Sequence, residues 1–392
     1  MARHTATGID VGTHHVRVVI SERARHEGKI YRRILGAGVS RSKGLRHGYI
    51  IDPTETVRSI REAVAKAESQ AGVRVRSAHV SLNGISLDSA TAVGSVVTSR
   101  ADAEITERDV EQATTEAERS FFKQETPSNR KVLHTIPVSY RIDGKEVLGR
   151  PVGMRGVKLD VEALLITCLE QHFSDLVSAV EAANVALEDI VAAPIAAALV
   201  NLSKTQKVAG VALANIGAET VSLVIYENSI PVSLKVFPIG STDITNDIAL
   251  GLRISLEEAE ALKIKGDREG RYPKKKLDEI IAARLSDILE LIQSHLKKIK
   301  KNELLPAGIV LTGGGSNITT IEDIARAALK LPARLASFEY LYPRDIIKDA
   351  SWSVAYGLSM LGLEFDETAE SGVKLARRAG GTFREWLRHV LP

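Results

Sequence analysis

The order of apolar and polar residues predicts alternating strands and helices at the start of the chain. Residues 7–20 form two runs of β-type residues around a Gly-Thr pair at 12–13, which predicts two strands joined by a tight turn. Residues 29–39 predict a third strand, and apolar positions at helical spacing over residues 57–67 predict a helix. We therefore expect an α/β domain to begin here.

The pattern changes between residues 84 and 165. Strand-like pieces rich in Val, Thr and Ser, including residues 131–141 and 156–167, surround one helix over residues 107–122. This size and this mixture indicate a small α+β domain inserted into a larger one.

The opening pattern occurs a second time, roughly 200 residues later. Residues 208–215 predict a strand, residues 216–220 a turn of small residues, and residues 221–226 a second strand. This duplication indicates two similar α/β halves, each contributing one hairpin to a central cleft.

A third turn, rich in glycine, follows a long amphipathic helix that we expect over residues 277–301. A buried strand within residues 308–312 leads into Gly313, Gly314 and Gly315. Successive glycines let a backbone approach a flat ligand or a phosphate closely; the alternative is a loop that requires positive φ.

The composition is that of an ordinary globular protein of two or more domains, with 392 residues, 44% hydrophobic and 26% charged. Cys168 is the only cysteine, which excludes an intramolecular disulfide and fits a reducing cytosol. The start of the chain lacks the apolar run of a secretory signal. The longest apolar run, residues 190–200, contains Pro194 and is too short to span a bilayer.

The positive charge of the chain is concentrated at its C-terminus. The net charge is +3, yet 47 basic and 48 acidic residues remain once residues 374–392 are set aside. This distribution argues against nucleic-acid binding by the body and for an anionic partner at the C-terminus.

Residues 381–392 predict a short amphipathic helix. Apolar residues recur three and four positions apart, with arginines on the flanks: Phe383, Trp386, Leu387, Val390 and Leu391, beside Arg384 and Arg388. Such a helix fits insertion at a membrane surface, and the polar residues 366–380 before it resemble a tether. The alternative is docking of the helix on the protein's own body.

Candidate chemistry begins at Asp10, whose carboxylate comes at the end of the first predicted strand. A carboxylate followed by a small-residue turn between two strands is how actin-fold ATPases hold phosphates; the alternative is a plain hairpin. No Ser/His/Asp set and no His/Cys cluster with metal-ligand spacing is suggested.

With these segments in order, the chain resembles the FtsA family, actin-like proteins of bacterial cell division. The resemblance covers nearly the whole chain and rests on seven segments: 8–13, 44–48, 133–137, 151–156, 244–249, 260–265 and 308–315. It implies an actin-like ATPase fold, two duplicated α/β halves around a nucleotide cleft, with a small α+β domain inserted in the first half. The pilus-assembly protein PilM has a similar body.

This reading divides the chain into six parts. They are a first half (1–83 with 166–200 and 345–365), an inserted domain (84–165), a second half (201–242 with 304–344), its outer subdomain (243–303), a linker (366–380) and the amphipathic helix (381–392).

The resemblance implies a peripheral membrane protein at the division site, on the cytoplasmic side of the inner membrane. It would bind ATP with Mg, polymerise, tether the tail of the tubulin-like protein FtsZ, and meet other division proteins through the inserted domain. The alternatives are a PilM-like adaptor, which would not be expected to carry the terminal helix, and a phosphotransferase, which needs a substrate base and an intact second phosphate turn.

The resemblance also implies roles for individual residues. The two phosphate turns would contribute Asp10, Gly12, Thr13, His15, Asn215 and Gly217; the ribose and adenine would meet Glu260 and Lys263; and Gly313, Gly314 and Gly315 would flank the adenosine. Arg284 matches a basic position of the FtsZ contact, with Lys275 and Lys276 nearby. For the lysines, a solvated basic face is the alternative.

Several residues depart from the family pattern, and each departure favours weaker ATP hydrolysis. Asn215 stands where a carboxylate would help to position hydrated Mg²⁺, Ala218 crowds the turn, and Glu219 adds negative charge near the phosphates. His15 replaces a usual Lys, and Ala193 stands where hydrolysing relatives often carry Glu. We expect weakened or absent hydrolysis, with nucleotide as a structural ligand; the alternative is a retuned but active site.

Overall fold

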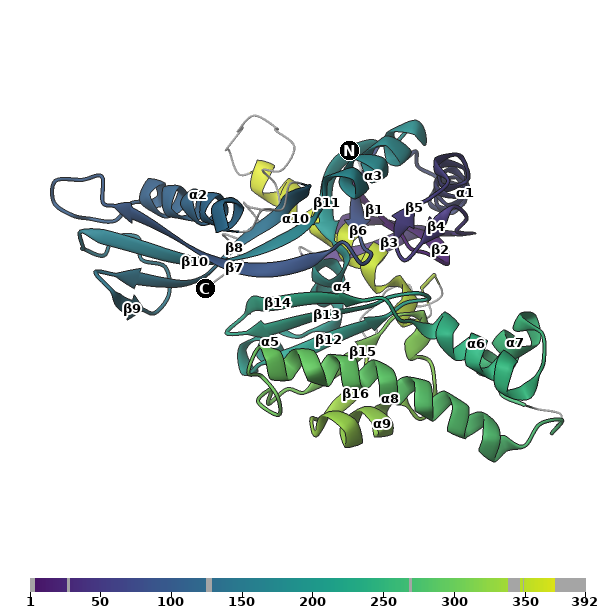
Figure 1. Ribbon diagram of the computed structural model, residues 1–392. Coiled ribbons are helices and arrows are strands. Elements are labelled where there is room, and N and C mark those ends of the chain that lie inside the picture. The colour runs from purple at the N-terminus through teal and green to yellow at the C-terminus, as the bar shows by residue number, and fades with distance from the viewer. Residues whose placement is uncertain are drawn as a thin grey trace.

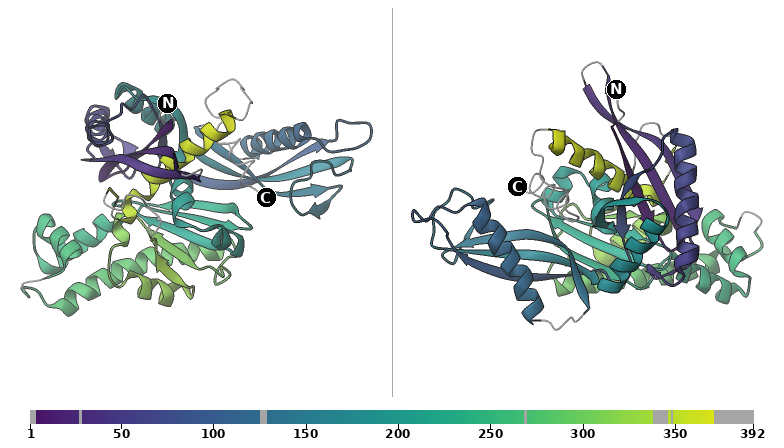
Figure 2. Two further views of the ribbon diagram at one scale, coloured as in Figure 1. Left: turned by 180° about the vertical axis from the view of Figure 1, so that it is seen from behind. Right: turned by 90° about the horizontal axis from the view of Figure 1, so that it is seen from above.

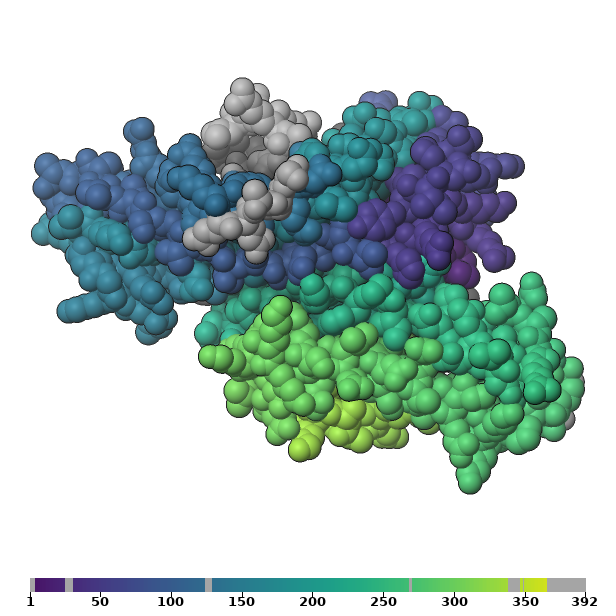
Figure 3. Space-filling view, in the orientation of Figure 1, coloured from purple at the N-terminus to yellow at the C-terminus, as the bar shows by residue number. Residues whose placement is uncertain are grey.

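The computed structural model describes residues 4–26, 29–124, 129–267, 270–337, 346–347 and 349–370. Figures 1 and 3 show a first half, a second half beside it, and an inserted domain that projects to one side of both. The expected amphipathic helix over residues 381–392 lies outside the described residues.

The first half is built on a five-stranded sheet. Its order is β11 (Ala186–Ala192), β6 (Ser77–Leu82), β1 (His4–Val11), β2 (His15–His26) and β3 (Lys29–Arg41). β1 and β2 pair antiparallel, whereas β6 runs parallel to both β1 and β11. The tight turn between β1 and β2 is therefore present where the sequence predicts it.

Helices cover both faces of this sheet at close range. α1 (Pro53–Ala71) lies against β3, where a Cβ on Gly38 would come within 1.9 Å of the Ala63 carbonyl oxygen. α10 (Ser353–Glu370) lies against β1, where a Cβ on Gly8 would come within 2.1 Å of the Ala355 carbonyl oxygen. Glycine at these two positions allows the helix backbones to approach the sheet this closely.

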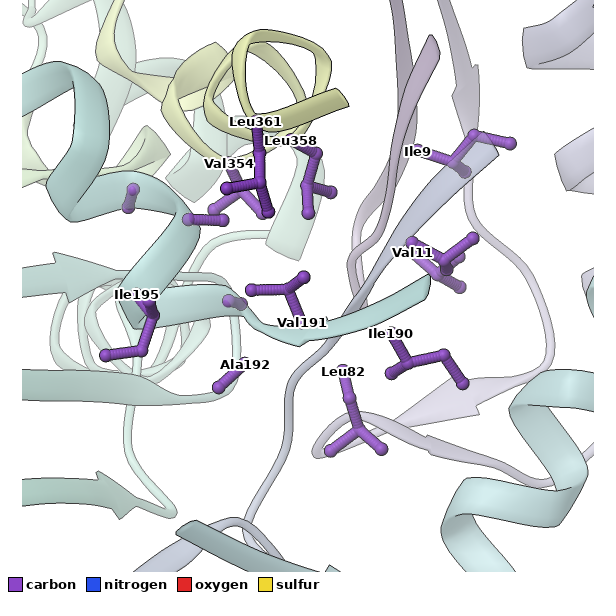
Figure 4. Packing of buried hydrophobic residues seen from close by; sticks show 14 of the residues in the cluster. Ile9, Val11, Leu82, Ile190, Val191, Ala192, Ile195, Val354, Leu358 and Leu361 are labelled. Carbon is purple, nitrogen blue, oxygen red and sulfur yellow. The ribbon is translucent and has the colours of Figure 1, made fainter. Parts of the chain in front are cut away.

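The main core lies between this sheet, α10 and α4 (Ala193–Asn201), which follows directly on β11. Figure 4 shows Val354, Leu358 and Leu361 of α10 gathered beside Val191 of β11. Each of these four side chains is at most 3% exposed. The core therefore fixes the direction in which α4 leaves the first half.

The second sheet is shared between the second half and the inserted domain. Its nine strands follow the order β16 (Ala333–Leu335), β15 (Ile309–Thr312), β12 (Val211–Ile216), β13 (Val221–Glu227), β14 (Ile230–Phe237), β7 (Asp88–Val97), β10 (Lys158–Leu169), β8 (Arg130–Ile142) and β9 (Lys145–Val147). The β12–β13 hairpin of the second half corresponds to the β1–β2 hairpin of the first.

A narrow contact joins β14 of the second half to β7 of the inserted domain. The ladder between them consists of the pair Lys235 and Asp88, whose side chains form an ion pair at 2.7 Å. Ser89 adds two hydrogen bonds, donating its hydroxyl to the Leu234 carbonyl and accepting the Leu234 N–H. The inserted domain therefore contacts the second half through β7 and β14. It is also joined to the first half, because the chain enters the inserted domain from the first half and returns to it.

The remaining elements complete the three parts. The first half and its connections contain β4 (Leu45–Arg46), β5 (Tyr49–Ile50), α3 (Glu170–Ala182) and η2 (Ala350–Trp352), and α2 (Glu107–Gln124) covers the inserted domain's sheet. The second half contains α5 (Lys204–Ala209), α6 (Ser241–Leu252), α7 (Leu256–Lys265), α8 (Lys274–Lys298), η1 (Gly314–Ser316) and α9 (Ile321–Leu329).

Two expected boundaries differ in the structure. The strand expected from residue 208 begins at Val211, because Ser203 and Gln206 form a capping box that makes residues 204–209 the short helix α5. α10 continues to Glu370, so the first residues of the expected linker are helical. Among the described residues, no helix has the length and apolar character needed to cross a bilayer.

Candidate functional site

The first turn joins β1 to β2 and is anchored by Asp10. Asp10 lies at the end of β1, accepts a hydrogen bond of 2.8 Å from the Ser81 hydroxyl, and pairs with Arg17 across the β1–β2 ladder. Burial raises the pKa of the Asp10 carboxyl above its usual value, and Arg17 opposes this rise. Gly12, Thr13 and His14 form the turn itself.

Arg17 is a further candidate site residue, which the sequence interpretation did not include. Its Nε is buried and has no hydrogen-bond partner among the described residues, and its guanidinium carbon lies 5.7 Å from the ring centroid of Trp352. Asp10 and Asp349 are its electrostatic counter-charges. A buried donor without an acceptor is costly, so this position favours an anionic ligand. The signal in the sequence is register, because residues 10 and 17 are paired in a hairpin with a turn at 12–14.

His14 and His15 stand side by side on this turn. Their Nδ1 atoms lie 2.9 Å apart. Burial, followed by the charge of Arg17, lowers the pKa of His15 to about 4, and burial followed by the charge of Arg41 lowers the pKa of His14. Both rings are therefore neutral near neutral pH. His15 does lack a fixed positive charge, as its identity predicts, but Arg17 supplies one two residues later.

The second turn joins β12 to β13 and is held against the start of α6. The Gly217 N–H donates to the Thr220 carbonyl at 2.8 Å, and the Ser241 and Thr242 N–H groups donate to the Gly217 and Ala218 carbonyls at 2.9 and 2.8 Å. The backbone φ of Ala218 is not positive, so this residue fits the turn without adopting the left-handed conformation.

Glu219, in the same turn, is bound by the first half. Its Oε2 accepts a hydrogen bond of 2.6 Å from the His47 N–H, and its carbonyl oxygen lies 3.1 Å from His47 Nδ1. The loop that contains His47 also receives the N–H of Ile85, at the root of the inserted domain. The Glu219 carboxylate therefore links the second turn to the first half rather than standing without a partner.

The three glycines after β15 have different surroundings. Gly313 has φ +91°, and a Cβ there would come within 2.2 Å of Asn215 Oδ1. A Cβ on Gly315 would come within 2.6 Å of the Ile216 side chain, whereas Gly314 is exposed and a Cβ on it would have no neighbour nearer than 3.9 Å. The requirement for positive φ thus explains Gly313, and Gly314 is the position open to a ligand.

Glu260 and Lys263 lie together on α7, facing α6. Lys263 Nζ donates to the Ser241 carbonyl at 2.9 Å and to Thr245 Oγ1 at 2.7 Å, and it lies 2.7 Å from Glu260 Oε2. The Lys263 side chain is 8% exposed. Both charges also act on His14, so α7 lies near the first turn. These contacts gather the two turns, the glycine loop and α6–α7 around one site, which we call the interhalf site.

Arg284, on α8, is engaged by acidic neighbours. Its Nε and one terminal nitrogen donate to the two carboxylate oxygens of Asp247 at 2.6 and 3.0 Å, and Asp287 lies 3.3 Å away. Lys275 and Lys276 are exposed at the start of the same helix, about 12–14 Å along its axis. The three residues therefore lie on one helix without forming a single cluster.

The donor set fits a nucleotide better than a metal held by side chains alone. Arg17 and the exposed Gly314 suit a polyphosphate and a flat base, whereas Asn215 gives the second turn a neutral ligand in place of a carboxylate. Within the described residues, no group of three or more His, Cys, Asp and Glu side chains is arranged to hold a metal ion.

Comparison of the whole structure with solved structures identifies the fold. The PilM–PilN type IV pilus biogenesis complex is matched with a TM-score of 0.67 at 17% identity, covering 91% of this chain and 98% of that one. MreB5 of Spiroplasma citri bound to ADP is matched with a TM-score of 0.54 at 13% identity, covering 94% and 99%. The chain has the actin-like ATPase fold, as predicted.

Sequence comparison then identifies the family. A family model described as "Cell division protein FtsA" matches residues 212–357, and a model of the SHS2 domain inserted in FtsA matches residues 84–167. The cell division protein FtsA of Bacillus subtilis (strain 168) is 32% identical, covering 86% of this chain and 79% of that protein. The chain belongs to the FtsA family of cell division proteins.

Proposed function

We propose that this chain is an ATP-holding scaffold of cell division, which polymerises on the cytoplasmic face of the inner membrane and tethers FtsZ filaments there. Its membership of the FtsA family supports the division role. The observation that carries the nucleotide part is the buried Nε of Arg17, which has no hydrogen-bond partner among the described residues and lies beside the first turn of the interhalf site.

ATP with Mg²⁺ is the proposed ligand of the interhalf site. The N–H groups of the turn at Gly12-Thr13 would hold the phosphates from one side, and the second turn would face them with its N–H groups beyond Gly217, whose own N–H is donated to the Thr220 carbonyl. A phosphate oxygen would be the acceptor that Arg17 Nε lacks. Gly314 would lie against the adenosine, with Glu260 and Lys263 toward the ribose and adenine. The β-phosphate and γ-phosphate of the bound nucleotide are anionic, which matches this donor set.

Hydrolysis is proposed to be weak or absent, because the side chains that would orient water are missing. Asn215 is neutral, and Ala193, at the start of α4, is fully buried and offers no polar group. The Glu219 carboxylate is hydrogen-bonded to His47 of the first half. A general base must reach the proton that it removes, and none of these three residues satisfies that requirement as they are placed.

A substitution at Gly314 tests nucleotide binding without disturbing the fold. Gly314→Leu finds space at its Cβ and places a bulky side chain where the adenosine is proposed to lie, so titration with fluorescent ATP should show at least a tenfold weaker Kd. Asn317→Leu, an exposed position in the same loop, is the matched control and should bind as the unaltered protein does. Equal affinity for all three proteins would contradict the proposed site.

Membrane attachment is proposed for residues 381–392, which lie outside the described residues. One short amphipathic helix binds lipid weakly, so stable attachment would require several copies in a polymer. Deletion of 381–392, or Trp386→Glu, should abolish pelleting with anionic vesicles. Unchanged pelleting of both variants would refute membrane attachment through this segment.

The FtsZ contact is proposed on α8, around Arg284 with Lys275 and Lys276, where an acidic tail would meet positive charge. Arg284 would have to exchange part of its pairing with Asp247 for the incoming carboxylates. The inserted domain is the proposed surface for other division proteins. A PilM-like adaptor role is supported only by likeness of fold, at 17% identity.

A further inference from the structure

The two hairpins of the interhalf site differ in charge at one equivalent position. Asp10 and Arg17 are direct partners across the β1–β2 ladder, and Asn215 and Ser222 are direct partners, at the same spacing in the chain, across the β12–β13 ladder. The left-hand view of Figure 2 shows the purple strands of the first half above the teal and green strands of the second. The first pair therefore contains an acid and a base, whereas the second pair contains neither.

The second pair is neutral and largely buried. Ser222 is 1% exposed, and its hydroxyl oxygen has no hydrogen-bond partner among the described residues. Asn215 lies next to the glycine loop, because a Cβ on Gly313 would come within 2.2 Å of Asn215 Oδ1. Leu213 and Val224, the next pair on the same face, belong to the main core that contains α4. This face of the second hairpin therefore offers hydrogen-bonding groups toward the first half, but no charge for a cation.

The acidic side chains that the described residues place around the site already have partners. Each one accepts a hydrogen bond or an ion pair from a neighbouring group: Asp10 from Ser81, Glu219 from His47, Glu260 from Lys263 and Asp349 from Ser351. Nucleotide sites hold Mg²⁺ through one or two carboxylates together with the phosphates of the substrate. Binding of the ion by one of these acids would therefore disturb or share an existing contact.

Arg17 offers what a phosphate requires without a metal ion. Its charge is balanced by Asp10 and Asp349, so it adds a donor to the site rather than an excess of positive charge. Its Nε is buried and has no hydrogen-bond acceptor among the described residues. A phosphate oxygen would satisfy this donor directly, in a charge-assisted hydrogen bond. The first hairpin therefore provides for the phosphates in a way that neither hairpin provides for an ion.

We propose that the interhalf site binds ATP independently of Mg²⁺, with the phosphates held by hydrogen-bond donors of the chain. An ion that arrives with the nucleotide stays bound to the nucleotide and to water. The proposal rests on ATP binding under Proposed function and concerns the part that the ion has in it. A site that used the ion as a bridge would lose affinity without it, whereas a site that uses donors keeps its affinity, because the phosphate oxygens remain acceptors.

The test is titration of the full chain with fluorescent ATP, once with Mg²⁺ and once with EDTA and no divalent cation. The ratio of the two Kd values should stay within about twofold for the unaltered protein. Asn215→Asp introduces a carboxylate into the second hairpin, so the ratio should rise to at least about tenfold, with the weaker binding in EDTA. The matched control, Asn317→Asp, adds the same charge at an exposed position of the glycine loop, and its ratio should stay within about twofold.

Arg17→Gln provides a second measurement of the same proposal. Loss of the guanidinium should weaken binding by the same factor with Mg²⁺ and in EDTA, about tenfold or more, because the donor acts in both conditions. A loss of affinity in one buffer alone would overturn the assignment of the phosphates to this donor.

The outcomes separate this proposal from the one on which it rests. Binding with Mg²⁺ that weakens by more than about twofold in EDTA, measured on the unaltered protein, would overturn the independence from Mg²⁺ and leave the nucleotide site standing. No binding in either buffer would overturn the nucleotide site and this proposal with it. Equal ratios for Asn215→Asp and Asn317→Asp would overturn the role assigned to the second hairpin.

Discussion

The carboxylate of Glu219 and the backbone N–H of His47 form a hydrogen bond of 2.6 Å between the two halves of the protein. The two residues are 172 positions apart in the chain. The bond holds the second turn against the loop that also contacts the root of the inserted domain through Ile85. Glu219, which the sequence suggests as a repulsive charge near the phosphates, thus has a structural partner.

Loss of the Glu219 carboxylate should loosen the loop around His47. Glu219→Ala removes a charge-assisted hydrogen bond worth about 1.5–3 kcal/mol, so amide exchange at His47 should accelerate by at least about tenfold. Hydrogen exchange measured by mass spectrometry over residues 44–50 detects this change. Glu257→Ala, an exposed acid on α7, is the control; the same exchange rate in both variants would contradict the link.

Arg17, whose Nε is buried, should matter more for ATP affinity than the exposed Arg41. Arg17→Gln should weaken the Kd for fluorescent ATP by about tenfold or more, since a desolvated charge-assisted bond to phosphate is lost. Arg41→Gln, opposite His15 in the ladder but exposed to solvent, should change the Kd by about twofold. Similar losses in the two variants would remove Arg17 from the proposed ligand set.

Acid should destabilise the protein partly through His172. Its Nδ1 lies 2.6 Å from the Ser86 hydroxyl and its Nε2 lies 3.0 Å from the Gly48 carbonyl, and burial lowers its pKa below the usual 6.5. The unfolded chain therefore binds more protons than the folded one below pH 6.5, and stability falls as pH drops through that value.

His172→Gln keeps a donor and an acceptor but cannot titrate in this range. The decrease in Tm between pH 7.5 and pH 5.0 should be smaller in this variant than in the unaltered protein, by about 2 °C. Differential scanning calorimetry at the two pH values provides the comparison. An identical decrease would show that another group, such as His15 with its pKa of about 4, accounts for the acid sensitivity.

The pairing of Arg284 with Asp247 allows a test in both directions. Arg284→Gln should weaken binding of an acidic FtsZ tail peptide, whereas Asp247→Asn frees the guanidinium and should strengthen it. Fluorescence anisotropy measures the peptide affinity. If Asp247→Asn leaves that affinity unchanged, the FtsZ contact lies elsewhere on the protein.

The parts of the fold that follow from local pattern were predictable from the sequence. The alternation of strand, turn and strand predicted the β1–β2 and β12–β13 hairpins. The duplication of this pattern, together with the motif segments, predicted the actin-like fold class. Where a helix signal competes with a strand-like run, the prediction was wrong: the Ser203–Gln206 capping box makes residues 204–209 helical, although Val208 and the residues after it look like a strand.

Contacts between distant segments were not predictable in this way. Arg17 looks like an ordinary polar residue of a strand, and only the ladder with Asp10 and the position of Trp352 make it a buried donor. In the same way, only the folded structure brings Glu219 to His47, or Arg32 to Glu364. The site residues proposed from the motifs remain proposals, and the structure adds Arg17 to them.

Single-turnover hydrolysis of ATP, measured together with its binding, tests the central claim most directly. We expect the unaltered protein to bind fluorescent ATP in the presence of Mg²⁺ and to release phosphate far more slowly than the ~1 s⁻¹ of an ordinary enzyme. Asn215→Asp should tighten Mg²⁺-dependent binding, because a carboxylate is restored at the second turn. Hydrolysis by the unaltered protein at a rate of ~1 s⁻¹ or above would contradict the account.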